Sequence, residues 1–106
     1  MQLKELLEVI DYTEIINRSG IDVNTTDIKN VSSYSDNATE NCVFVCIMGS
    51  VVDGHEFAIN AYSKGCRVFI AQKPLDNIPN DSFIIIVKDS RVALAQLSAA
   101  FFDYPA

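Results

Sequence analysis

The sequence predicts an α/β domain with a small mixed or mostly parallel sheet and helices on both faces. Two apolar runs, at residues 43–48 and 83–87, are rich in β-branched and aromatic residues, which is typical of strands covered on both sides. Apolar residues at helical spacing follow each run. Because strands and helices alternate along the chain, a layered α/β architecture is expected.

The first expected element is a short amphipathic helix that covers one face of the sheet. Its apolar residues recur at i, i+3, i+4 and i+7, with charged residues between them: Leu3, Leu6, Leu7 and Ile10. Residues 11–24 are polar and irregular, so a loop is expected there. A strand of weak alternation is expected within 27–34, followed by a polar loop at 35–41.

Residues 43–65 combine a strand, a tight loop and a helix. Gly49 ends the strand, and Gly65 is expected to end the helix. The helix is indicated by apolar residues at helical spacing: Phe57, Ala58, Ala61 and Tyr62. The next apolar run, at 68–71, can return parallel to the first strand, which makes a strand, crossover helix and strand unit.

The last expected elements are an interior strand at 83–87 and a helix that begins near Asp89 and Ser90. Both residues are natural N-caps, so they are interpreted as caps rather than as part of a catalytic triad. The helix is expected to be largely buried and to be closed by Pro105.

Composition excludes several classes of function. The chain has 106 residues, 49% hydrophobic and 21% charged, which suits a single domain over residues 1–106. A formal net charge of −6 argues against nucleic acid as a partner, because phosphate binding rests on Lys and Arg. No apolar run approaches the roughly 20 residues that span a bilayer, and the first residues do not resemble a signal peptide. A cytoplasmic protein with no membrane partner is expected.

The three cysteines are predicted to be buried, reduced thiols rather than a metal site. Cys42, Cys46 and Cys66 each lie in or beside an apolar strand. Along a strand, the α-carbons of Cys42 and Cys46 would lie about 13 Å apart, at roughly 3.3 Å per residue. That separation is too large for two ligands of one metal ion.

The loop between Gly49 and Gly54 has the glycine spacing of a phosphate-binding loop but lacks its chemistry. His55 and Glu56 stand where such a loop needs a Lys and a Ser or Thr, so ATP binding is not expected. Two readings stay open for the helix start. Asp53 caps the helix itself, which the spacing favours, or the free amides meet an anionic or polar ligand. His55 is interpreted as a helix-start residue without a catalytic role.

Several short motifs occur in a fixed order: Phe44, Val45 and Gly49; Asp53, Gly54, His55, Phe57, Ala61 and Gly65; residues 87–95; and Ala100, Phe101 and Pro105. In this order they resemble the N-terminal domain of the Mur ligases, over residues 27–106. The most similar members add the third residue to the peptidoglycan stem peptide.

The resemblance implies a domain that docks the UDP end of a UDP-N-acetylmuramoyl-peptide and is not catalytic alone. It implies a parent enzyme in which a central domain of the same polypeptide binds ATP and Mg²⁺, so that no cofactor belongs to this domain. A C-terminal domain would present the incoming amino acid.

The resemblance also implies which residues contact UDP. Ser33 and Ser35 belong to the turn after the early strand, and the loop after Gly49 supplies the rest: Ser50, Val51 and Val52. Tyr34 and Asp36 replace the acid and the arginine of the family turn, which removes a cation and adds a negative charge. Both groups follow strand ends, where α/β sheets commonly bind ligands.

Two alternatives remain from the sequence. One is a stand-alone α/β interaction or regulatory module that has lost ligand binding. The other is the N-terminal domain of a different Mur ligase, such as the dipeptide-adding enzyme.

Overall fold

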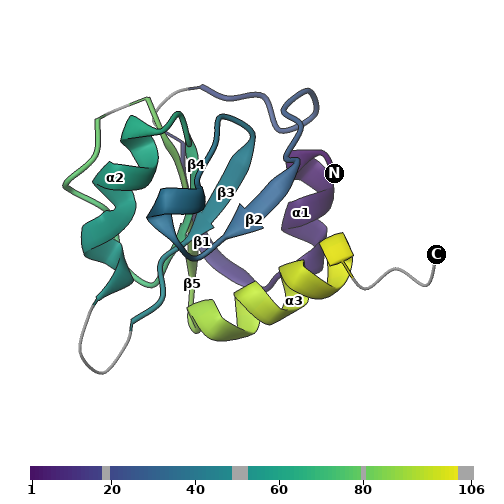
Figure 1. The fold of residues 1–106 in the computed structure, drawn as a ribbon. Coiled ribbons are helices and arrows are strands. Elements are labelled where there is room, and N and C mark those ends of the chain that lie inside the picture. The colour runs from purple at the N-terminus through teal and green to yellow at the C-terminus, as the bar shows by residue number, and fades with distance from the viewer. Residues whose placement is uncertain (18–19, 49–52, 80, 103–106) are drawn as a thin grey trace.

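The computed structural model describes residues 1–17, 20–48, 53–79 and 81–102, and it contains a five-stranded sheet (Figure 1). In chain order the strands are β1 (Tyr12–Asn17), β2 (Asn30–Ser32), β3 (Cys42–Val45), β4 (Val68–Ala71) and β5 (Phe83–Val87). Their order in the sheet is β1-β5-β4-β3-β2, and only β1 runs antiparallel to its neighbour. The prediction of an α/β fold with a mixed, mostly parallel sheet is confirmed.

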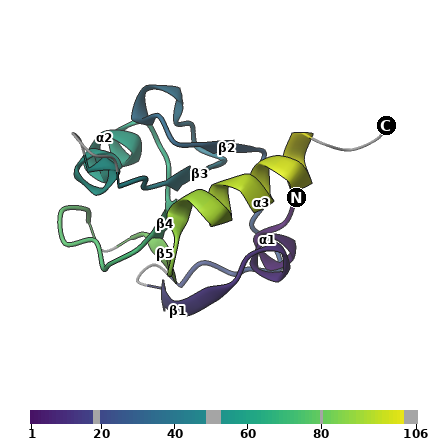
Figure 2. The ribbon, with the colours of Figure 1, turned by 90° about the horizontal axis from the view of Figure 1, so that it is seen from below.

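Helices cover both faces of this sheet (Figure 2). One face carries α1 (Leu3–Val9) and α3 (Ser90–Phe102), whose buried side chains share one core cluster with the strands. The other face carries α2 (Ala58–Ser63), preceded by the 3₁₀ helix η2 (Gly54–Phe57). A second 3₁₀ helix, η1 (Ser35–Asn37), follows β2 and lies against α2.

The central strands are buried on both sides, and successive side chains enter different cores. In β3, Val43 and Val45 pack toward α1 and α3, whereas Phe44 packs toward α2. On the α2 side the ring of Phe44 meets that of Phe69 edge to face, with centroids 6.3 Å apart. This double burial explains why β3, β4 and β5 have continuous apolar sequences.

The expected loop at 11–24 is wrong in its first part, because Tyr12–Asn17 forms the edge strand β1. It pairs with β5 from Tyr12 opposite Val87 to Asn17 opposite Phe83. Its residues are exposed or half-buried. An edge strand needs no apolar run on either face, so its sequence does not resemble that of the interior strands.

Other boundaries also differ from the expectations. The strand expected within 27–34 is limited to β2, and the strand expected to reach residue 48 ends at Val45. The helix after the loop begins as the 3₁₀ turn η2 before α2, and Gly65 ends it with a φ of +106°. The last helix is not largely buried: it packs on one side only, and Val92 is 52% exposed. Pro105 lies outside the described residues.

Two expectations about the chain's chemistry can be compared with the structure. The three cysteines are buried, free thiols, as predicted. Among the described residues, no helix is both long enough and apolar enough to cross a membrane.

Candidate functional site

A groove of about 460 Å³ lies where the chain after β2 meets the start of η2. We call it the serine groove, and it is lined by Ser33, Tyr34, Ser35, Asp36, Ile47, Gly54 and Phe57. Its volume is within the range of about 300–1,000 Å³ common for small-molecule sites. The groove therefore has the size to hold part of a small ligand.

The turn that carries Tyr34 is fixed by the preceding serine side chain. Ser32 Oγ accepts a hydrogen bond from the Tyr34 amide at 3.0 Å and donates one to the Tyr34 carbonyl at 2.8 Å. Ser32 is buried and Tyr34 is exposed, so these bonds are partly buried. The backbone of this turn, which forms one side of the groove, is thus held in place before any ligand binds.

Asn60, on α2, connects this helix to the segment that follows β2. Its Nδ2 donates to Ser35 Oγ at 2.8 Å and to Asp36 Oδ1 at 3.4 Å. Because Ser35 Oγ accepts from Asn60, its own hydroxyl proton remains to be donated elsewhere. Ser35 is itself buried, so a ligand that reached it would meet a directed donor.

Gly54 brings the start of η2 against the end of the β3 segment. Its amide donates to the Ile47 carbonyl at 2.7 Å, and Met48 and Asp53 form an isolated antiparallel bridge. A Cβ atom at Gly54 would lie 2.6 Å from the Ile47 oxygen and 2.7 Å from its nitrogen. Only glycine permits this approach, which places Ile47 and η2 in the same groove.

Asp53 caps η2, which confirms the interpretation that the sequence favoured. Its Oδ1 accepts from the His55 amide at 2.9 Å and from His55 Nδ1 at 2.6 Å. Its Oδ2 is 3.1 Å from Lys73 Nζ. The His55 amide and the nearby cation hold the pKa of Asp53 down to about 2.

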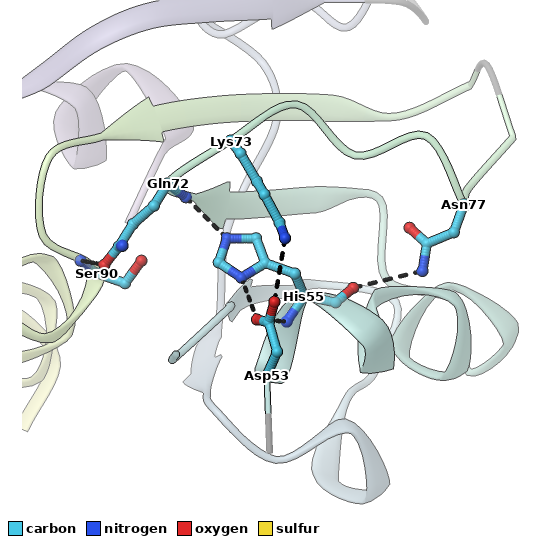
Figure 3. A network of polar contacts seen from close by, with 6 residues as sticks. All are labelled: Asp53, His55, Gln72, Lys73, Asn77 and Ser90. Atoms are coloured by element: carbon cyan, nitrogen blue, oxygen red, sulfur yellow. Dashed lines mark hydrogen bonds and ion pairs between the residues drawn. The ribbon is translucent and has the colours of Figure 1, made fainter. Parts of the chain in front are cut away.

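The buried ring of His55 connects three parts of the chain, as Figure 3 shows. Its Nε2 accepts from the Gln72 amide at 2.9 Å, which leaves Nδ1 to donate to Asp53. The Gln72 side chain continues the connection, because its Oε1 accepts from the Ser90 amide at the start of α3. His55 is therefore a structural residue, which agrees with its interpretation from the sequence.

The polar groups at the start of η2 are paired with one another and with other parts of the chain. The carboxylate of Asp53 already accepts from the His55 amide, and both His55 ring nitrogens have partners within the chain. The nearby cation, Lys73, is itself paired with the Asp53 carboxylate. The absence of an ATP site in this domain stays a prediction.

The structure brings some of the expected UDP contacts together. Ser33 and Ser35 both line the serine groove, and so does Ile47, which precedes the loop after Gly49. Ser50, Val51 and Val52 lie outside the described residues. Their proposed role, like that of the two serines, stays a prediction.

Two residues of the site were missed by the sequence reasoning. Phe57 was named only as part of the helical pattern and of the ordered motifs, but it is 44% exposed and lines the groove. Asn60 was not considered, although it binds Ser35. The two are three residues apart, which is the spacing of one helical face, but this spacing alone does not tell what that face meets.

Comparison with known proteins identifies the family. The sequence model described as "Mur ligase family, catalytic domain" matches residues 27–102. The chain belongs to the Mur ligase family. The resemblance carried by the ordered motifs is therefore confirmed.

Curated relatives of this Mur ligase chain are named as ligases or synthetases of UDP-N-acetylmuramoyl peptides. It is 36% identical over 105 residues to UDP-N-acetylmuramoyl-L-alanyl-D-glutamate--2,6-diaminopimelate ligase of Alkaliphilus metalliredigens, covering 99% of the chain and 20% of that protein. It is 34% identical over 98 residues to UDP-N-acetylmuramyl-tripeptide synthetase 2 of Oceanobacillus iheyensis, covering 92% of the chain and 20% of that protein. The chain thus spans about a fifth of the length of these relatives.

Solved structures of Mur ligases share the fold. A crystal structure of MurF from Acinetobacter baumannii superimposes with a TM-score of 0.76 at 26% identity, over 92% of this Mur ligase chain and 20% of that one. MurF ligase from Thermotoga maritima in complex with ADP gives 0.55 at 29% identity, over 71% of the chain and 16% of that one.

Proposed function

We propose that this chain is the substrate-docking domain of an ATP-dependent ligase that adds the third amino acid to UDP-N-acetylmuramoyl-dipeptide. Residues 1–106 form one domain that holds the UDP end of this substrate in the serine groove. The observation that carries the proposal is the position of the groove within the family match, with Ser33 and Ser35 in its wall. The names of the relatives supply the substrate class.

The proposal assigns no catalytic step to this domain. In the parent enzyme, ATP and Mg²⁺ bind a central domain of the same polypeptide, where the chemistry takes place. The start of η2 supports this division, because Asp53 and His55 bond each other there instead of presenting free donors to a triphosphate.

The third-residue assignment is favoured over the dipeptide-adding alternative by sequence identity. The two relatives described above, named as diaminopimelate ligase and tripeptide synthetase, are 36% and 34% identical to the chain. The MurF structures from Acinetobacter baumannii and Thermotoga maritima, whose folds are similar, are 26% and 29% identical. The higher identity to the enzymes named for the third residue is the observation that favours this assignment.

Titration of the ¹⁵N-labelled chain with UDP and with UDP-N-acetylmuramoyl-dipeptide tests the proposal. We expect saturable NMR shifts at the amides of Ser33, Ser35 and Asn60, and at those of residues 50–52. Ser35→Ala removes one hydroxyl from the groove and should weaken UDP binding by roughly two- to tenfold, the range for one lost hydrogen bond. Ser98→Ala, on α3, is the matched control and should leave the affinity unchanged. Unperturbed groove amides at saturating UDP would exclude the proposed function.

A further inference from the structure

The lining of the serine groove suits the uncharged part of a nucleotide better than its phosphates. Among the seven described residues that line it, the only charged side chain is that of Asp36, which is negative. A diphosphate placed in the groove would meet this carboxylate with no cation among the lining residues to offset it. The nucleoside end, which carries no charge, avoids this repulsion.

The same groove presents two exposed aromatic rings. Tyr34 is 72% exposed and Phe57 is 44% exposed, and both line it. Exposed aromatic side chains provide flat apolar surfaces on which nucleobases stack in many single-strand binding proteins. Two such rings at one groove give a pyrimidine ring apolar surface that it does not find in water.

Both rings are attached to fixed parts of the backbone. Tyr34 is held through the two hydrogen bonds to Ser32, and η2, which carries Phe57, is capped by Asp53. Asn77 Nδ2 also donates to the His55 carbonyl of η2, at 3.4 Å. A preformed backbone lowers the entropy that is lost when a ligand binds.

A polar group beside the rings can recognise the edge of the base. Ser35 Oγ accepts from Asn60, and among the described residues its hydroxyl has no acceptor, so it can donate to a carbonyl oxygen of a ligand. Uracil has two ring carbonyls, so a base in contact with the aromatic rings can satisfy this donor. The combination of a planar apolar surface and one directed donor is typical of small-molecule sites.

We propose that Tyr34 and Phe57 hold the uracil ring of the substrate by stacking and edge contact, with the diphosphate outside the serine groove. The proposal rests on the proposed function and adds the residues that bind the base. Tyr34 and Phe57 then act as positioning residues that determine affinity for the nucleoside.

The test compares variants with and without each ring. Tyr34→Ala and Phe57→Leu remove a ring, whereas Tyr34→Phe keeps it and removes only the hydroxyl. Tyr12→Ala is the matched control, because Tyr12 is a tyrosine exposed to 44% that does not line the groove. Uridine, UDP and inorganic pyrophosphate serve as probes, and the amide spectrum of each variant verifies its fold.

We expect Tyr34→Ala and Phe57→Leu each to weaken uridine and UDP binding by the same factor, about five- to a hundredfold. Tyr34→Phe and Tyr12→Ala should bind within about twofold of the original chain. Magnetisation transfer from the rings of Tyr34 and Phe57 to uracil H5 and H6 should be visible in the wild-type complex. Pyrophosphate alone should not shift the groove amides.

The outcomes separate the two proposals. If UDP binds and shifts the groove amides but Tyr34→Ala and Phe57→Leu retain its full affinity, the stacking role is wrong and the docking function stands. If pyrophosphate shifts these amides as UDP does, the groove holds the phosphates and the stacking role is again wrong. If UDP does not bind to the wild-type chain, both proposals fail.

Discussion

At the scale of single residues, Gly54 shows how one position can determine the shape of the candidate site. Its backbone φ lies outside the left-handed region, so glycine is not needed there for its conformational freedom. It is needed because its amide binds the Ile47 carbonyl and leaves no room for a Cβ atom. The close approach of these two backbone segments forms one side of the serine groove.

Gly54→Ala should therefore destabilise the fold. The added methyl would lie 2.6 Å from a backbone oxygen, which cannot rotate away as a side chain can. We expect a loss of about 1–3 kcal/mol in the free energy of unfolding, the usual cost of forced overpacking. Urea denaturation followed by circular dichroism measures it.

The control for this change is Glu56→Ala, an exposed position two residues further along η2. It should stay within about 0.5 kcal/mol of the original chain, as most surface substitutions do. Equal midpoints for the two variants would show that the backbone relaxes around the new methyl group at no cost.

Residue roles could be predicted from the sequence where the partner is nearby in the chain. Asp53 was interpreted as a cap, and its partner is His55, two residues away. The connection from His55 to Gln72 could not be predicted, because it depends on how β4 ends beside η2. The sequence indicated a helix-start histidine but not that its ring is buried between elements.

At the scale of elements, the interior strands were the easiest to predict and the edge strand was the hardest. β3, β4 and β5 are covered on both faces, which requires continuous apolar runs. β1 lies at the edge of the sheet, and its side chains are exposed or half-buried. Its sequence therefore has no apolar run, and Tyr12–Asn17 was interpreted as part of a loop. The final helix was predicted in position, but its one-sided packing could not be seen in a segment rich in alanine.

The cap of η2 gives this element a dependence on pH. The folded-state pKa of Asp53 is lowered to about 2 from the usual 3.8. An ionised Asp53 therefore stabilises the fold fully above about pH 4, and this contribution is lost as the pH falls through about 2. Asp53→Asn should lower stability at neutral pH and flatten the fall in unfolding free energy between about pH 4 and pH 2. Urea denaturation across this range measures the difference.

Asp11→Asn is the matched control, because Asp11 is exposed and lies outside the His55 network. It should keep the acid dependence of the original chain. A parallel pH profile for Asp53→Asn and the original chain would show that the carboxylate charge does not hold η2 in place.

At the scale of the whole molecule, the candidate site is assembled from segments that are distant in sequence. The serine groove takes residues from the turn after β2, from the end of the β3 segment and from η2, and Asn60 of α2 connects them. The serines could be named in advance only through the motifs shared with a family. Phe57 was missed because local spacing does not tell which side of a short helix meets the sheet.

The first part of the chain lies outside the family match but belongs to the core. The match begins at residue 27, whereas α1 places Leu3 and Leu6 among fully buried residues that pack with β3, β5 and α3. The backbone also joins the two parts, since the Leu3 amide donates to the Thr26 carbonyl and the Ile28 amide to that of Met1. These contacts support the prediction that residues 1–106 form a single domain, and we expect it to unfold cooperatively.

Leu6→Ala tests this prediction directly. It removes a fully buried side chain from α1 and should lower the free energy of unfolding by about 2–5 kcal/mol, the range for such cavities. If the domain is cooperative, the variant will unfold in one transition. Circular dichroism and the amide signal of Phe69, whose side chain packs on the opposite face of the sheet, will then give the same midpoint. Glu8→Ala, an exposed change in the same helix, should leave the midpoint almost unchanged. A variant in which α1 melts first while Phe69 keeps its original midpoint would mean that residues 1–26 are an appendage to the matched domain and not part of its core.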